Sequence, residues 1–238
     1  MVHDNVLKVQ NQIQEACRLC GRNIQEITLV AVTKYATVEG IQEAIDSGIR
    51  DIAESRVEEA QQKFPPLLAK NSKVRAHLIG HLQTNKAKDV ITVGAYGHMP
   101  LFIQSVDSLK LAQEIEKQAA KLDKTVDILV QFNIAREEQK FGAAPQDALN
   151  LIEGISPLTH IRMKGFMCMA PYTQDQDIIR KTFVSLRSIR DQVKITFRGH
   201  PRVDTGVLSM GMSGDYKIAI EEGSTMVRLG SAIFKSGK

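Results

Sequence analysis

Two hydrophobic periods alternate along the chain. Short runs rich in β-branched residues, typical of buried strands, are separated by longer stretches in which apolar residues recur at helical spacing. The short runs predict strands at residues 27–33, 49–53, 74–79, 101–106, 126–134, 161–169, 205–209 and 225–229. The longer stretches predict helices at 38–47, 54–63, 108–122, 145–153, 176–193 and 215–222, after a first helix near the N-terminus.

This alternation favours parallel strands joined by crossover helices. Eight strand–helix units in 238 residues match the size of a (β/α)₈ barrel, here with an additional N-terminal helix. A doubly wound open sheet is the alternative that periodicity leaves open. Segments 65–66 (Pro-Pro) and 94–100 are interpreted as loops between units, and no repeat or linker marks a boundary. We therefore expect one α/β domain over residues 1–238.

Composition narrows the function classes. With 43% hydrophobic and 24% charged residues the chain resembles an ordinary globular protein, and no apolar run reaches the roughly 20 residues of a membrane span. The N-terminus lacks the pattern of a secretory signal, so a cytoplasmic location is expected. The net charge of +4 is scattered, which favours a small anionic ligand over nucleic acid.

The number of cysteines also favours a cytoplasmic location. Three cysteines form no disulfide framework and suit a reducing environment. Cys17 and Cys20 have a redox-like spacing, but they continue the helical apolar row that begins at Val6, which predicts core packing.

The first candidate for chemistry is Lys34. It ends the buried-strand pattern ITLVAVTK, which puts an amine at the carboxyl end of the first barrel strand, where barrel enzymes build their sites. A lysine partly removed from water can condense with an aldehyde in its neutral form. A solvated lysine that caps the strand is the alternative interpretation.

The second candidate is a pair of glycine- and serine-containing junctions, LSMGMSGD at 208–215 and GSTMVRLGS at 223–231. Glycine lets the backbone approach a phosphate, and a following helix offers N–H groups without acceptors. In barrels, the loops after the seventh and eighth strands often hold a phosphate. Alternatively, both are simple turns with capping serines. Combined with Lys34, they match the aldehyde and phosphate ends of pyridoxal 5'-phosphate (PLP).

Motifs along the chain then give a family resemblance. The segments AVTKY, HLIGHLQTNK, QFNIAREEQKFG, GFMCMAP, LSMGMS and GSTMVRLG occur in the order found in the PLP homeostasis proteins, which the chain resembles over about residues 27–234. Those proteins are similar to the N-terminal PLP-binding barrel of alanine racemases. The resemblance implies that PLP is held as a Schiff base on Lys34.

It also implies roles for other residues. Ser209 would contact the phosphate through its hydroxyl, and Gly230 and Ser231 through their backbones. Arg228 would face the pyridine nitrogen, where a permanently protonated guanidinium makes the ring a poorer electron sink than a carboxylate partner does. The other residues expected to line the cofactor are His77, Ile79 and Asn85.

Two positions depart from the family pattern. Ser55 stands where the family usually has asparagine, so any amide contact there is shortened or replaced by a hydroxyl. Ala76 replaces the usual tryptophan, which predicts looser packing beside that strand.

Other polar residues carry weaker hypotheses. His77 and His81 are four residues apart, but a strand end and Gly80 separate them, so no metal site is expected. Lys140 is interpreted as solvated, with attraction of anionic substrates as the alternative. The stretch 113–124 is interpreted as a solvent face that carries Glu116 and Lys117.

The family resemblance is compatible with two functions, a protein that only carries PLP and an enzyme that uses PLP for catalysis. A racemase needs a second base opposite Lys34, which alanine racemases take from a C-terminal β domain, and we expect no such domain before Lys238. We therefore expect a PLP homeostasis protein, a monomer without catalytic residues, that buffers PLP or delivers it to apo PLP-dependent enzymes. The alternatives are a one-domain racemase that uses Cys168 or Tyr172, and a phosphate-binding barrel without PLP.

Overall fold

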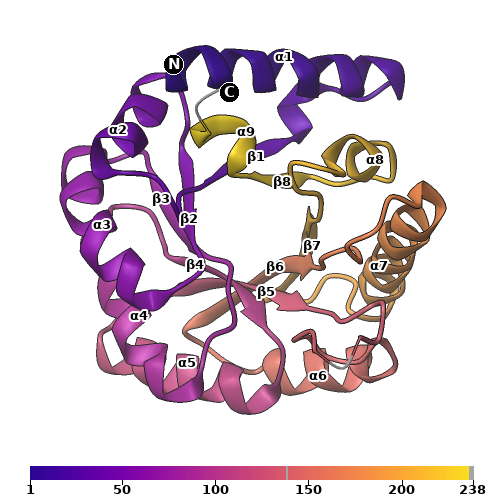
Figure 1. Ribbon diagram of the computed structural model, residues 1–238. Helices are drawn as coiled ribbons and strands as arrows, with labels where there is room; N and C mark the ends of the chain where they lie inside the picture. The colour runs from indigo at the N-terminus through magenta and orange to yellow at the C-terminus, as the bar shows by residue number, and fades with distance from the viewer. Residues whose placement is uncertain (138, 236–238) are drawn as a thin grey trace.

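A closed parallel barrel forms the centre of the molecule. The computed structural model describes residues 1–137 and 139–235, which leaves Glu138 of the EEQKFG segment and the last three residues of the predicted domain outside the described residues. Eight strands pair in sequence order, and β1 closes the sheet against β8 (Figure 1). The strands are β1 (Thr28–Val32), β2 (Asp51–Glu54), β3 (Arg75–Leu78), β4 (Phe102–Val106), β5 (Val126–Gln131), β6 (Ile161–Met167), β7 (Val203–Ser209) and β8 (Met226–Leu229).

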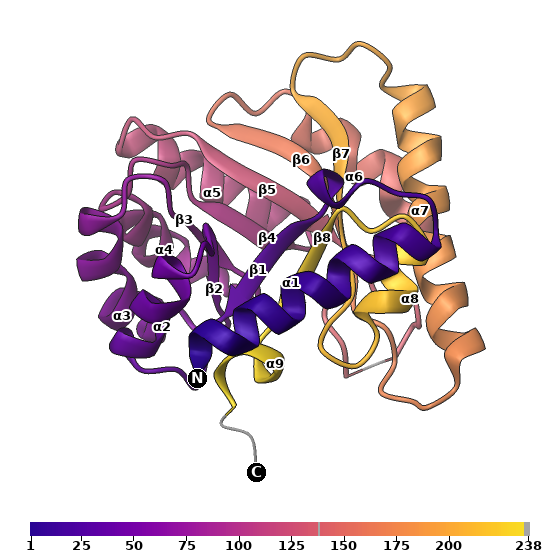
Figure 2. The same cartoon turned by 90° about the horizontal axis from the view of Figure 1, so that it is seen from above.

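Helices surround the barrel on its outside. They are α1 (Val2–Leu19), α2 (Val38–Asp46), α3 (Val57–Lys70), α4 (Ala87–Gly94), α5 (Leu109–Lys121), α6 (Ala148–Ile155), α7 (Gln176–Thr196), α8 (Tyr216–Glu221) and α9 (Ser231–Phe234). The additional helix α1 precedes β1 and packs against α2, α8 and α9 (Figure 2). The prediction of a (β/α)₈ barrel with an extra N-terminal helix is thus confirmed.

Two apolar layers account for this architecture. The larger, outer apolar layer lies between the strands and the helices, which explains why β4 and β5 are buried at every position. The smaller, inner layer occupies part of the barrel interior, with one residue from each of six strands: Val30, Ala53, Phe102, Leu129, Met167 and Met226. The alternation of a strand sends successive side chains to these two layers.

The helix α3 corrects the interpretation of the Pro65-Pro66 segment. A loop was expected there, yet the helix runs from Val57 to Lys70 with both prolines inside it. Phe64, Leu67 and Leu68 on either side of the prolines are almost fully buried. Burial of this apolar face outweighs the hydrogen bonds that the prolines remove.

Three smaller features complete the comparison with the sequence. The helix α4 was not among those predicted. Cys17 is buried in the core as expected, whereas Cys20 is half-buried. Glu116 is not a simple solvent-facing charge, because its carboxylate accepts the backbone N–H groups of Thr159 (3.0 Å) and His160 (2.7 Å) and so fixes the entry to β6.

No helix in the described part of the chain is long and apolar enough to span a membrane.

Gly165 is the glycine on which strand pairing in the barrel depends most directly. Its φ of +146° lies in a region that favours glycine, and a Cβ there would lie 1.9 Å from the Val207 carbonyl oxygen on the neighbouring strand. The backbones of β6 and β7 therefore meet at a point with no room for a side chain.

We predict that Gly165→Ala lowers the free energy of unfolding by about 3 kcal/mol or more, through backbone strain and a displaced strand. Gly214→Ala is the matched control, because a Cβ at Gly214 meets no atom within 4 Å. Urea denaturation of both variants measures the difference. Equal stabilities would contradict this account of the β6–β7 contact.

Candidate functional site

The β1–β8 pairing brings the two ends of the predicted site together. Val30 of β1 is in register with Arg228 of β8, and a Cβ on Gly230 would lie 3.0 Å from the Val32 carbonyl oxygen. Lys34 follows two residues after Val32, at the carboxyl end of the barrel. Lys34 and Gly230 thus belong to neighbouring chain segments, although almost 200 residues separate them. The Lys34 side chain is exposed, with its Nζ 5.2 Å from the ring centroid of Tyr35.

The first turn of α9 supplies backbone donors next to this point. Gly230 is the N-cap of α9 and Ser231 its first residue. The first N–H groups of a helix have no acceptor within the helix, and they point outward from its N-terminus. The predicted backbone contacts therefore lie beside the end of β1, on the side of the barrel that carries Lys34.

Arg228 is buried at the base of the same region. Only 3% of it is exposed; its Nη1 donates to the Ser209 hydroxyl at 2.6 Å and its Nη2 to the Cys168 carbonyl at 3.0 Å. Burial lowers the pKa of the Arg228 guanidinium, and the negative charge of Asp215 opposes this change. Because the ordinary pKa of arginine is so high, the group stays cationic at neutral pH.

The Ser209 hydroxyl is already engaged in this arrangement. It accepts from Arg228 and donates to Gln104 Oε1 at 2.7 Å, and the residue is fully buried. A phosphate contact from this hydroxyl would need it to exchange one of these partners. The family resemblance predicted the phosphate role, but no sequence motif predicted the contact between Ser209 and Arg228.

His77 belongs to the barrel interior. It is 1% exposed, and its ring lies 5.0 Å from that of Phe102. Its Nε2 is 2.9 Å from Asp51 Oδ1, and its Nδ1 is 2.9 Å from Gln104 Nε2. Sequence analysis missed both of these partners. Gln104 carried a usable signal, since it and Ser105 are polar residues inside a strand run whose other residues are apolar.

The remaining predicted residues lie in the loops after β2 and β3. Gly80 packs directly on Ser55, because a Cβ on Gly80 would lie 2.0 Å from the Ser55 carbonyl oxygen. Ile79 packs against the interior apolar cluster. Asn85 is exposed in a 3-10 turn (Thr84–Lys86), so its contact with a cofactor stays a prediction.

Comparisons with known proteins show the family of the chain. The family described as "Alanine racemase, N-terminal domain" matches residues 8–237. A pyridoxal phosphate homeostasis protein of Aquifex aeolicus is 34% identical over 235 residues, covering 99% of this chain and 98% of that protein. The chain belongs to this homeostasis-protein family.

Solved structures share the fold at nearly full length. PipY of Synechococcus elongatus, with PLP bound, has a TM-score of 0.82 at 26% identity, covering 99% of this chain and 100% of that one. A protein of Bifidobacterium adolescentis described as unknown has a TM-score of 0.90 at 34% identity, with 98% and 94% coverage.

A buried ionic cluster in this homeostasis-family protein fixes the residue before Lys34. Glu54 is fully buried, and its Oε1 accepts from Thr33 Oγ1 at 2.7 Å and from Lys63 Nζ at 2.8 Å. Lys63 also donates to Glu59 at 3.0 Å and to the Thr33 carbonyl at 3.1 Å. Both the side chain and the carbonyl of Thr33 are thereby held in place.

Within the described chain, the second carboxylate oxygen of Glu54 has no partner. Burial raises the pKa of Glu54 despite its bonds to Lys63 and Thr33. Burial alone would lower the pKa of Lys63, but its bonds to Glu54 and Glu59 raise it. The raised pKa of Lys63 keeps its ammonium group charged at neutral pH.

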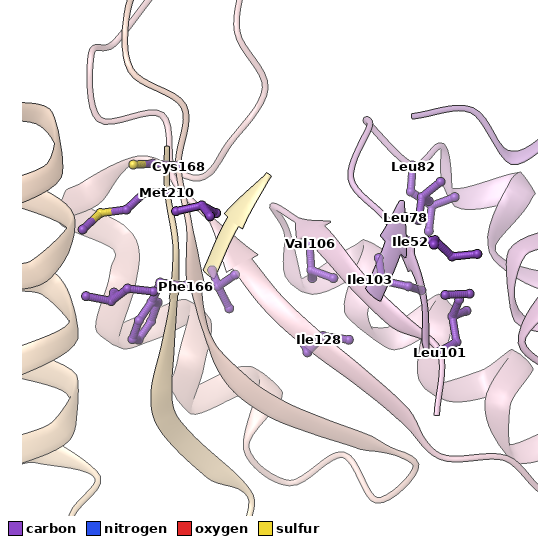
Figure 3. Packing of buried hydrophobic residues seen from close by; sticks show 14 of the residues in the cluster. Ile52, Leu78, Leu82, Leu101, Ile103, Val106, Ile128, Phe166, Cys168 and Met210 are labelled. Carbon is purple, nitrogen blue, oxygen red and sulfur yellow. The ribbon is translucent and has the colours of Figure 1, made fainter. Parts of the chain in front are cut away.

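The two residues considered as a racemase base lie at opposite extremes of burial. Cys168 is fully buried and belongs to the outer apolar layer, close to Met210 (Figure 3). Burial raises the pKa of its thiol to about 12, so the thiol stays protonated at neutral pH. Tyr172 has a fully exposed side chain.

The other polar candidates have separate partners. The His81 ring stacks on Phe141 at 3.7 Å and its Nδ1 lies 3.6 Å from Asp107, so it shares no ligand with His77. Across the residues that the structure describes, no group of three or more His, Cys, Asp or Glu side chains is arranged to hold a metal ion. Lys140 is not simply solvated, because its Nζ donates to Glu137 at 2.6 Å and to the Ala170 carbonyl at 3.2 Å.

Proposed function

We propose that the protein binds PLP covalently on Lys34 and acts in PLP homeostasis, buffering the cofactor or delivering it to apo PLP-dependent enzymes. The observation that carries the proposal is the convergence of an amine, a helix N-terminus and a buried guanidinium at one end of the barrel. Membership in the homeostasis family supports the same conclusion. The proposed location is the cytoplasm, where three free cysteines stay reduced.

The residues fit this cofactor in chemistry and position. PLP supplies an aldehyde, which condenses with a lysine amine, and a ring that stabilises negative charge. Lys34 offers the amine. Gly230, which has no Cβ, and the N–H of Ser231 offer a site for the phosphate at a helix start. Arg228 offers a cationic donor for the ring nitrogen, and Ser55, His77 and Asn85 complete the proposed lining.

The proposal also assigns the protein a holding role without significant turnover of amino acids. Two observations support this. In the described chain Arg228 donates to a hydroxyl and a carbonyl but to no carboxylate, so a cation without a direct ion pair faces the ring and disfavours ring protonation. The thiol of Cys168 is protonated and lies in the outer apolar layer, so it is a poor base.

Replacement of the lysine tests the covalent step. Lys34→Ala should lose the visible absorbance of bound PLP and the adduct that borohydride traps, because no amine remains at the end of β1. Lys140→Ala is the control, since Lys140 is another lysine in a loop at the carboxyl end of the barrel. A trapped adduct of normal yield in Lys34→Ala would show that a different lysine is used.

Replacement of Ser231 tests the phosphate site. Ser231→Pro removes one backbone N–H at the first helical position, where proline is well tolerated. Gly230 has no Cβ, but its φ of −115° and ψ of −69° lie in the α region that a following proline disfavours, so urea denaturation of the variant is measured alongside its affinity. A lost charge-assisted hydrogen bond of about 1.5–3 kcal/mol should weaken PLP binding roughly 10- to 100-fold. Binding of pyridoxal, which lacks the phosphate, should be unchanged.

Ser231→Ala, which keeps the N–H, should bind PLP nearly as well as the wild type. Equal losses for PLP and pyridoxal in Ser231→Pro would argue against a phosphate contact at this position.

Proton exchange separates the carrier from a racemase. Holoprotein incubated with L-alanine in deuterium oxide should show α-proton exchange far below the roughly 1–10³ s⁻¹ of ordinary enzymes, because Arg228 disfavours ring protonation and, among the described residues, the buried Cys168 thiol is a poor second base. Nuclear magnetic resonance reports exchange, and a chiral assay reports racemisation. Enzyme-like rates of both would support the racemase instead.

A further inference from the structure

A continuous chain of hydrogen bonds crosses the barrel interior beneath the proposed site. It runs from Arg228 on β8 to Ser209 on β7 (2.6 Å) and from Ser209 to Gln104 on β4 (2.7 Å). It continues from Gln104 to His77 on β3 and from His77 to Asp51 on β2, both at 2.9 Å. Five strands therefore contribute one polar side chain each to a single path.

The chain has one consistent direction of donation. Arginine can only donate, so the Ser209 oxygen accepts from Arg228 and its proton goes to Gln104 Oε1. The Gln104 amide nitrogen then donates to His77 Nδ1, which leaves the proton of the neutral ring on Nε2, facing Asp51. The carboxylate of Asp51 can only accept. Reversing the amide would leave the Ser209 proton without an acceptor in the chain.

The two ends of the chain carry opposite charges in different surroundings. Arg228 is buried, whereas Asp51, the first residue of β2, has 19% of its side chain exposed. Hydrogen bonds aligned in one direction polarise one another, so the chain links the buried cation to a partly solvated anion that it does not touch. A buried charge needs such compensation.

We propose that Ser209, Gln104, His77 and Asp51 are positioning residues that hold the Arg228 guanidinium toward the ring nitrogen of PLP. The inference rests on the proposed function for the identity of the ligand. It gives Ser209 a different role from the phosphate contact that the family resemblance implies, and it adds Gln104 and Asp51 to the site.

The histidine tautomer tests the chain without any ligand. In ¹⁵N-labelled protein, the resonances of His77 should show a proton on Nε2 and none on Nδ1, because Nδ1 accepts from Gln104 and Nε2 faces Asp51. A ring protonated on Nδ1 overturns the direction of the chain.

An analogue without the ring nitrogen tests the role of the chain in binding. The wild type should bind PLP about 10- to 100-fold more tightly than 1-deaza-PLP, in which C–H replaces that nitrogen, because only PLP accepts from Arg228. Ser209→Ala and Gln104→Met should each reduce this preference about threefold or more. The first variant removes the hydroxyl that accepts from Arg228, and the second removes the amide oxygen that orients this hydroxyl. The second variant nearly conserves volume beside Met226, whose sulfur lies 3.2 Å from the amide nitrogen.

Ser105→Ala is the matched control, because Ser105 is buried next to Gln104 and, among the described residues, its hydroxyl has no partner. It should keep the wild-type preference. If Ser209 instead contacts the phosphate, Ser209→Ala weakens both ligands equally and the preference is unchanged, which overturns the positioning role. Failure of the wild type to bind PLP overturns both the proposed function and the positioning of Arg228 toward the ring nitrogen. The tautomer measurement needs no PLP, so it still tests the direction of the hydrogen-bond chain.

Discussion

Closure of the sheet by pairing β1 with β8 is the constraint on which the site depends. The strands of a parallel barrel all end at one face, and closure makes the first and last of them neighbours. The amine of Lys34 and the helix start at Gly230 meet only because Val32 packs directly on Gly230. A side chain at that glycine would separate the segments that carry the two ends of the proposed ligand.

Closure also creates an interior in which charge must be compensated. Apolar side chains from six strands occupy part of that interior, and the path from Arg228 to Asp51 occupies another part. Removing a guanidinium from water costs several kcal/mol unless polar groups replace its hydration. Here a hydroxyl and a backbone carbonyl are the direct replacements. Both are neutral, so they solvate the positive charge without an ion pair, and the negative charge of Asp215 offsets it without a hydrogen bond.

The sequence predicted those features that depend on local periodicity. Strand runs such as 126–131 are mostly apolar and are buried at every position because both faces are covered, and this pattern predicts a parallel barrel from the sequence. Pro65-Pro66 was misjudged because the local rule against proline inside a helix ignores the burial of Phe64 and Leu67 in the tertiary structure. Tertiary packing, which a one-dimensional pattern does not contain, decided the outcome.

For the site, the family motifs supplied Lys34 and Arg228, but no motif could supply the contacts between them and other residues. Ser209 and Gln104 are 105 positions apart, and only the shear of the barrel brings their side chains together. Asp51 was equally hidden, because the predicted strand 49–53 contains it but no motif pairs its carboxylate with His77, which lies 26 positions away.

The seam between β1 and β8 has a consequence for the order of folding. β8 is the last strand to leave the ribosome, so β1 keeps an unpaired edge until nearly the whole barrel has been synthesised. An exposed strand edge is a template for pairing with other chains. Helix α1 also gains its packing partners late, because Asn5 donates to the Ile233 carbonyl at 2.9 Å, a contact that spans 228 positions. Contacts of such long range slow folding, because the entropy of loop closure must be lost before they form. The nascent chain therefore carries its open edge for longer than a barrel closed by local contacts would.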